Sequence, residues 1–148
     1  MIKKFTLILL VFTLGCKSAQ VATDEMPVIF MSKSACMGTC PVYDISVYSN
    51  GRVLLNAKQF LKIEGSYAAD LPKTELSALL NAFEQSNFTS YEKSYTSNMT
   101  DLPTTRLTYR GSGEAYTIVD YDGAPKSLKD LERRVHELVE KLDWKSIR

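Results

Sequence analysis

The chain has 148 residues, of which 45% are hydrophobic and 24% charged, and its formal net charge is +1. This length accommodates one domain, and the composition is that of an ordinary globular protein. Removal of residues 1–15, which include Lys3 and Lys4 but no acidic residue, would leave a nearly neutral chain. Because nucleic-acid binding depends on a basic surface that displaces phosphate counterions, this charge balance argues against a nucleic-acid partner.

The first fifteen residues have the pattern of an export signal. Lys3 and Lys4 precede an apolar run over residues 5–14, which is interrupted only by two threonines. A permanent membrane helix needs ~20 residues, whereas this run has the length of a signal-peptide core. We therefore predict that residues 1–15 are a signal peptide that is removed.

Gly15 and Cys16 end the apolar run. The segment resembles a bacterial lipoprotein signal, in which a small residue precedes a cysteine that is acylated and becomes the new N-terminus. Thr13 and Leu14 depart from the usual pattern, which has leucine three residues before the cysteine and a small residue two before it. The alternative is an ordinary cleaved signal that leaves Cys16 unmodified. Two or more acyl chains would anchor the protein stably, since each buried CH₂ contributes ~0.8 kcal/mol.

Lys17 follows the cysteine in place of an aspartate that would favour retention at the inner membrane. The resemblance to lipoprotein signals therefore implies an outer-membrane location, with the domain on the periplasmic or the outer side. Residues 17–26 are mostly small and polar, as expected of a flexible segment. We predict a tether over residues 16–26 and a single domain over residues 27–148.

The first half of this domain has the pattern of β-strands. Residues 26–31 are predicted to form a first strand. Residues 42–48 alternate between apolar and polar side chains, and residues 52–57 form the return strand of a hairpin. Asn50 and Gly51 between them suit a tight turn, because both residues adopt positive φ angles readily. Residues 60–67 are predicted to continue the sheet.

Two of the three cysteines, Cys36 and Cys40, lie within the predicted domain. Such a pair suits an oxidising compartment, and Gly38 permits the tight backbone that a short loop requires. We predict a structural disulfide, which stabilises by about 2 kcal/mol because the loop is so short. The alternative is a redox-active dithiol, although its spacing exceeds C-x-x-C and Pro41 leads into a strand. Two cysteines and a single histidine do not fill a zinc site, so we expect neither a metal nor a cofactor.

The second half begins with an amphipathic helix over residues 72–86 and a long loop over residues 87–103. Strands over residues 104–110 and 114–121 form a second hairpin, and a helix follows with proline at its start. The fold class expected is α+β, with two layers: an antiparallel sheet built from two hairpins and two helices packed on one face. The apolar stripe of the last helix comprises Leu128, Leu131, Val135, Leu138 and Leu142.

Several motifs resemble a bacterial domain-of-unknown-function family, number 6438. The main one, C-x-G-x-C-P-x-Y, runs from Cys36 to Tyr43. The resemblance covers most of the chain from Pro27 to Leu142 and implies a domain common among predicted lipoproteins, with no activity attached. Further matching segments are residues 48–51, 95–97, 100–104, 119–121 and 123–125.

The long loop and the second hairpin hold the candidate binding residues. The loop tyrosines are either a recognition surface or side chains that pin the loop to the core. Arg106 lies on a predicted strand from which its side chain could bridge to the carboxylate of Asp101 or of Asp120. Such a bridge is either part of a binding site or a structural ion pair. The single histidine, His136, is expected on a solvated helix face. The candidate surface comprises Tyr91, Tyr95, Asp101, Arg106, Asp120 and Tyr121.

No nucleophile–histidine–acid spacing and no glycine-rich phosphate loop is present in the sequence. The leading hypothesis is a non-enzymatic, lipid-anchored binding or structural module of the cell envelope, with an envelope protein or a glycan as partner. One alternative is a thiol–disulfide redox protein that uses Cys36 and Cys40. The other is a hydrolase that uses Asp101 and Asp120 as acid and base.

Overall fold

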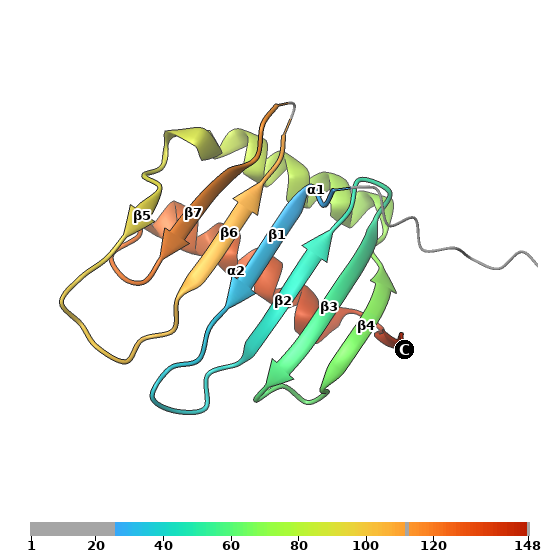
Figure 1. The fold of residues 1–148 in the computed structure, drawn as a ribbon. Helices are drawn as coiled ribbons and strands as arrows, with labels where there is room; N and C mark the ends of the chain where they lie inside the picture. The colour runs from blue at the N-terminus through green and yellow to red at the C-terminus, as the bar shows by residue number, and fades with distance from the viewer. Residues whose placement is uncertain (1–25, 112, 148) are drawn as a thin grey trace, which may run out of the picture.

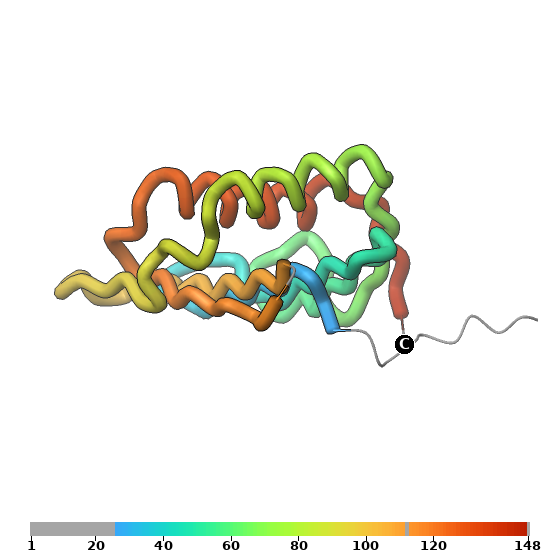
Figure 2. The backbone as a smooth tube through the Cα atoms, turned by 90° about the horizontal axis from the view of Figure 1, so that it is seen from above, coloured from blue at the N-terminus to red at the C-terminus, as the bar shows by residue number. Residues whose placement is uncertain are grey.

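Two helices cover one face of an eight-stranded sheet in the computed structural model, which describes residues 26–111 and 113–147 (Figure 1). Seen along the sheet, both helices lie on the same side (Figure 2). The predicted α+β class is therefore confirmed. The predicted signal peptide, Cys16 and all of the predicted tether except Met26 lie outside the described residues.

The strands occur in the spatial order β5-β7-β6-β1-β2-β3-β4-β8. The bounds of the strands are β1 Ile29–Lys33, β2 Val42–Val47, β3 Arg52–Gln59, β4 Gly65–Asp70, β5 Ser94–Tyr95, β6 Thr105–Tyr109, β7 Tyr116–Asp120 and β8 Lys145–Ser146. The helices are α1 Lys73–Gln85 and α2 Lys126–Lys141, with a 3₁₀ turn, η1, at Phe88–Ser90. Neither α1 nor α2 is long and apolar enough to cross a membrane.

The sheet differs from the one expected, which was purely antiparallel and made of two hairpins. Both hairpins are present, as β2–β3 and β6–β7, but β1 lies between them and pairs with both β2 and β6. The sheet is mixed, because β5 pairs with β7 in parallel. β5 lies inside the segment expected as a loop and has two residues, too few to show an alternating pattern.

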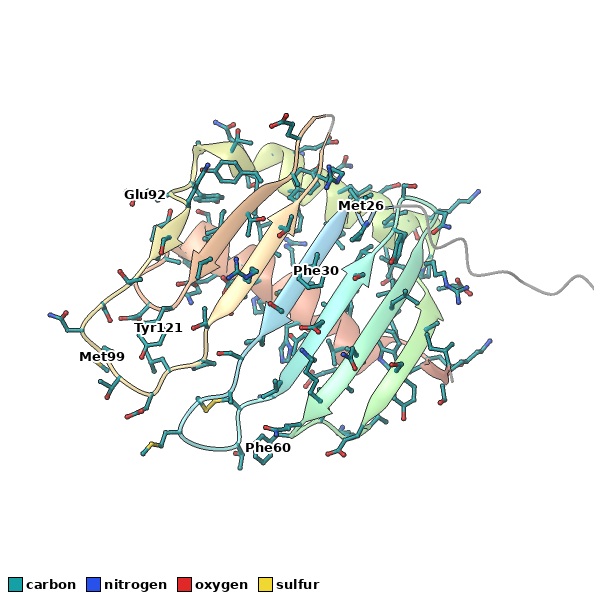
Figure 3. All side chains as sticks on the ribbon, in the orientation of Figure 1. Met26, Phe30, Phe60, Glu92, Met99 and Tyr121 are labelled. Carbon is teal, nitrogen blue, oxygen red and sulfur yellow. A yellow bond between two sulfur atoms is a disulfide. The ribbon has the colours of Figure 1, made fainter. Side chains whose placement is uncertain are left out.

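Alternation along the strands separates the two faces of the sheet. Ile29 and Met31 of β1 point toward the helices and are fully buried, whereas Phe30 between them points to the open face (Figure 3). Both helices close the core with residues spaced three or four apart. Four of the five residues predicted for the stripe of α2 are buried, whereas Leu142 lies just after the end of the helix and is half-buried. The largest fully buried side chains are Tyr43, Phe83, Ile29, Met31, Ile45, Leu55, Leu107, Ile118, Leu128, Val47, Val53 and Val135.

The β2–β3 turn depends on Gly51, which has a φ angle of +88°. Its N–H donates to the Tyr48 carbonyl over 3.0 Å, and its carbonyl accepts a 2.8 Å hydrogen bond from the Leu71 N–H. A Cβ atom at this position would lie 2.9 Å from the Leu71 carbonyl oxygen, closer than a side chain tolerates. The predicted hairpin is thus formed, but only Gly51 has the positive φ angle that was expected of both Asn50 and Gly51. Gly51 also joins the hairpin to the end of β4.

We predict that Gly51→Ala lowers the free energy of unfolding by about 1–3 kcal/mol, because alanine is strained at positive φ and its Cβ meets backbone. The matched control is Gly113→Ala, where no atom lies within 4 Å of the added Cβ and φ is not in the left-handed region. Urea denaturation followed by circular dichroism measures both variants. Equal stabilities for the two would contradict this role of Gly51.

Candidate functional site

A hollow of about 450 Å³ lies between α2 and the end of the sheet where β1 ends and β6 begins. We call it the polar hollow, because most of its lining side chains carry charges or hydrogen-bonding groups. Its volume lies within the range of small-molecule pockets. The lining residues are Lys33, Leu102, Pro103, Thr105, Tyr121, Asp122, Lys129, Glu132, Arg133 and His136.

The long loop after β5 forms one wall of the polar hollow. The Tyr121 hydroxyl donates to the Met99 carbonyl over 2.9 Å and accepts from the Leu102 N–H over 3.4 Å, and Figure 3 shows Tyr121 inside the bend of this loop. Thr104 is tied to Ser34 by two hydrogen bonds, one from its N–H to the Ser34 hydroxyl and one from the Ser34 N–H to its carbonyl. The wall is therefore fastened both to β7 and to the segment that follows β1.

The Cys36–Cys40 loop supports this wall from outside. The two sulfurs lie at disulfide-bonding distance and the Cα atoms are 5.7 Å apart, in agreement with the predicted pair. The Met37 N–H donates to the Asp101 carbonyl over 3.1 Å. Through this contact the short loop holds the long loop in place at the mouth of the hollow.

A buried group of charges lies under the polar hollow. Asp120 ends β7 on the helix-facing side of the sheet, next to Thr105, and is only 1% exposed. The Lys129 ammonium forms an ion pair with Asp120 and lies 3.7 Å from a Glu132 carboxylate oxygen. Two carboxyl groups and one lysine thus meet between β7 and α2, where exclusion of water strengthens their interactions.

Burial raises the pKa of Glu132 to about 7, and the negative charge of Asp120 adds to this effect, whereas Lys129 and Lys33 oppose it. Oδ1 of Asp120 and Oε1 of Glu132 are buried and accept no hydrogen bond among the described residues. A proton held on Glu132 gives this carboxyl group a donor toward Asp120, which also favours its neutral form. Glu132 therefore keeps its proton at a higher pH than an exposed glutamate does.

Lys33 is the remaining cation of this group. It ends β1, is half-buried, and forms no ion pair among residues 26–111 and 113–147. Burial lowers its pKa, as does the nearby Lys129 charge, while Glu132 and Asp120 act in the opposite direction. Its ammonium group thus lines the polar hollow with no anion as a direct partner.

His136 does not lie on a solvated helix face, as was expected, but is half-buried against the sheet. Its Nδ1 atom is 2.6 Å from the Tyr43 hydroxyl, and the two rings stack with centroids 5.6 Å apart. Burial lowers the pKa of His136, and the Lys33 charge lowers it further. The imidazole is therefore mainly neutral at neutral pH.

The structure does not bring Asp101, Arg106 and Asp120 together. Arg106 pairs in register with Val119 and is exposed on the open face, whereas Asp120 pairs with Thr105 and points toward α2. Adjacent positions of a strand face opposite sides, so the expected bridge from Arg106 to Asp120 is not formed. Asp101 is exposed in the long loop, with a φ angle of +69°.

The loop tyrosines pack against the core. The Tyr91 ring lies edge-on to Phe88 with centroids 6.0 Å apart, and the Tyr91 carbonyl accepts a 2.7 Å hydrogen bond from the Tyr116 hydroxyl. The Tyr95 hydroxyl accepts from the Glu92 N–H over 3.1 Å. Both tyrosines are half-buried, which favours a role in pinning the loop.

Lys33, Lys129 and Glu132 were not among the site residues predicted from the sequence. One signal for them was present: residues 129, 132 and 136 lie three and four positions apart, so a helix places them along one side. The side of α2 that faces the sheet end thus combines cationic, acidic and imidazole groups. No cluster of histidine, cysteine and acidic residues suited to a metal ion occurs within the described part of the chain. The arrangement can hold a polar ligand and exchange a proton.

A sequence model of the family described as Domain of unknown function (DUF6438) matches residues 27–139. This match includes every residue that lines the polar hollow. No curated protein matches the chain. The chemistry of the site must therefore be inferred from its own geometry.

The pKa of Glu132 predicts how stability depends on pH. In the folded chain Glu132 holds its proton up to about pH 7, compared with an ordinary value of 4.5, so the folded state binds more protons between these values. The contribution of Glu132 to folding stability is therefore fully present below pH 4.5 and is lost as the pH rises from 4.5 to about 7. Glutamine cannot lose a proton, so the stability of Glu132→Gln relative to wild type should rise by on the order of 2 kcal/mol between about pH 5 and about pH 8.

Urea denaturation at a series of pH values measures this difference. The matched control is Glu114→Gln, which makes the same change at an exposed loop position. Its stability difference from wild type should not change across the same pH range. Parallel pH profiles for wild type and Glu132→Gln would show that Glu132 ionises normally.

Proposed function

The chain belongs to the family described as Domain of unknown function (DUF6438), and we propose that it is a lipid-anchored binding module of the bacterial cell envelope. The proposed ligand site is the polar hollow. One observation carries this proposal: the half-buried Lys33 ammonium lines the hollow and has no ion pair among the described residues. A charge held partly out of water without a direct partner is costly unless a ligand supplies one.

The lipid anchor is supported by the apolar run of residues 5–14, which ends at Gly15 and Cys16. The geometry of the domain suits an anchor of this kind. Met26, the last residue of the proposed tether, lies at one end of the sheet, whereas Phe60 and Tyr121 lie at the opposite end (Figure 3). A lipid at Cys16 would thus leave the polar hollow directed away from the point where the tether joins the domain. An outer-membrane location is proposed from Lys17.

Binding fits the site better than catalysis by carboxylates. Asp120 is 1% exposed, pairs with Lys129 and does not line the hollow, so it has no access to a substrate. Asp101 lies in the exposed loop and is also absent from the hollow lining. A general acid or base must come within hydrogen-bonding distance of the reacting group. The two acids that the sequence suggested for a hydrolase do not meet this requirement together.

A thiol–disulfide redox function is also less well supported. Reactive thiols are commonly activated at the N-terminus of a helix or beside a cation. Cys36 and Cys40 instead lie in a loop between β1 and β2, and the contact from Met37 to Asp101 gives that loop a structural role. We therefore assign the pair to support of the hollow wall.

The lipid anchor predicts the behaviour of Cys16→Ser. In a native or closely related host, the wild-type chain should fractionate with the outer membrane and incorporate a fatty-acid label, and Cys16→Ser should lose the label and become soluble. Ser18→Ala, two residues away, is the matched control and should behave as wild type. Unchanged membrane fractionation and labelling of Cys16→Ser would contradict the anchor.

The ligand site predicts what accompanies the purified protein. When the lipidated chain is isolated from envelopes and its bound material is identified by mass spectrometry, Lys33→Gln should lose at least one component that wild type retains. The matched control is Lys73→Gln, which removes a lysine at the exposed start of α1, outside the polar hollow. Identical bound material in all three proteins would count against the polar hollow as the site of binding.

A further inference from the structure

A second hollow lies beside the polar hollow along α2. It has a volume of about 290 Å³, and its lining is mainly apolar. We call it the apolar hollow; its apolar lining comprises Pro41, Phe60, Leu61, Ile63, Val139 and Trp144. His136 lines both hollows, so they adjoin at this side chain, and we call the two hollows together the groove.

The groove follows one side of α2. Lys129 and Glu132 line its polar half, His136 lies at the junction, and Val139 and Glu140 line its apolar half. These positions recur every three or four residues, as expected for one helix face. At a rise of 1.5 Å per residue, the distance from position 129 to position 140 is about 16 Å. The groove is thus long enough for an extended small molecule with chemically different ends.

The polar half contains one cationic side chain without an ion-pair partner among the described residues. Lys129 is neutralised by Asp120, and Arg133 is paired at the surface with Asp130 and Glu137. Lys33 alone has no ion pair among the described residues that line this half. One negative charge on a ligand would satisfy it, whereas a second negative charge would find no further unpaired cation among the described residues of this half.

The apolar half presents an ordered surface. The Trp144 indole N–H donates to the Val139 carbonyl over 2.9 Å, which fixes the ring at the end of α2. Leu61 and Ile63 of the β3–β4 turn pack partly against the core, and Phe60 stands at the rim, 53% exposed, with a φ angle of +58°. Burial of an alkyl chain against such a surface contributes ~0.8 kcal/mol for each CH₂ group.

We propose that this groove binds a linear amphiphilic carboxylate of medium chain length, with the carboxylate on Lys33 and the alkyl chain in the apolar hollow. The inference rests on the proposed function, because it names the ligand class of the same binding module. One negative charge matches the unpaired lysine, an alkyl chain matches the apolar lining, and a linear shape matches the path along α2. Neutral His136 places no charge between the two halves, and the two charged residues of the apolar hollow, Lys62 and Glu140, are exposed to solvent.

Decanoate, below the concentration at which it forms micelles, is the probe for this groove. The chain contains one tryptophan, Trp144, so its fluorescence reports on the apolar half directly. We use the Cys16→Ser chain, which retains every described residue but lacks the proposed lipid. Decanoate should produce a saturable change in Trp144 emission, and decanol, which has the same chain without the charge, should bind about tenfold more weakly or worse.

Substitutions in each half separate the two contributions. Lys33→Gln should weaken decanoate binding about tenfold or more and leave decanol binding unchanged, and Lys73→Gln should bind both as the unsubstituted chain does. Phe60→Asn should weaken both probes a few-fold, because asparagine tolerates positive φ but removes the apolar rim. Thermal unfolding of each variant establishes that it is folded.

Three outcomes would overturn the inference: equal affinities for decanoate and decanol, full affinity for decanoate in Lys33→Gln, or tighter binding of decyl phosphate than of decanoate. Absence of any change in Trp144 emission would do the same. If these occur while envelope material still depends on Lys33, the ligand class is wrong and the binding function stands. If no envelope material depends on Lys33 but decanoate binds as expected, the groove is a carboxylate site outside the proposed envelope role.

Discussion

The ion pair between Asp120 and Lys129 determines the rest of the site. It joins the end of β7 to α2 in a place where the carboxylate is 1% exposed. Loss of the half-exposed Lys129 would leave the buried Asp120 carboxylate without a compensating charge, which is destabilising. Burial and the negative charge of Asp120 raise the pKa of Glu132, and Lys129, which also pairs with Asp120, only partly opposes them. Lys33 is left without a direct partner among the described residues. The contact between β7 and α2 thus contributes to both features of the polar hollow.

Local pattern was enough to predict the elements but not their neighbours. The turn at Asn50 and Gly51, the apolar stripe of α2 and the short cysteine loop are all determined within a few residues, and the structure agrees with them. The position of β1 between the two hairpins depends on pairing across the chain, as in the register of Ile29 with both Val47 and Tyr109. The residue pattern within β1 does not indicate which strands it pairs with. The sequence therefore led to a sheet of two hairpins without β1 between them.

The same limit explains which site residues the sequence revealed. Asp120 was recognised as a candidate, but the assignment of its partner required the strand register, which sends Arg106 to the open face and Asp120 toward α2. Tyr43 and His136 are 93 residues apart in the sequence, and only the packing of α2 on the sheet brings them to 2.6 Å. In the sequence, a single histidine with charged neighbours is expected on a solvent-exposed helix face. Its burial results from the packing of α2 on the sheet, which the sequence pattern does not show.

The contact between Tyr43 and His136 also gives the groove its continuity. Burial raises the pKa of Tyr43 and lowers that of His136, so both groups favour their neutral forms and can share a hydrogen bond without a net charge. A charged histidine at this junction would disfavour an alkyl chain there, because the chain would displace water that solvates the cation and would offer no hydrogen bond in its place. The positive charge of Lys33 helps to keep the imidazole neutral. In the unliganded groove, the lysine at the polar end thus adds to the effect of burial, which is the larger cause of the neutral imidazole.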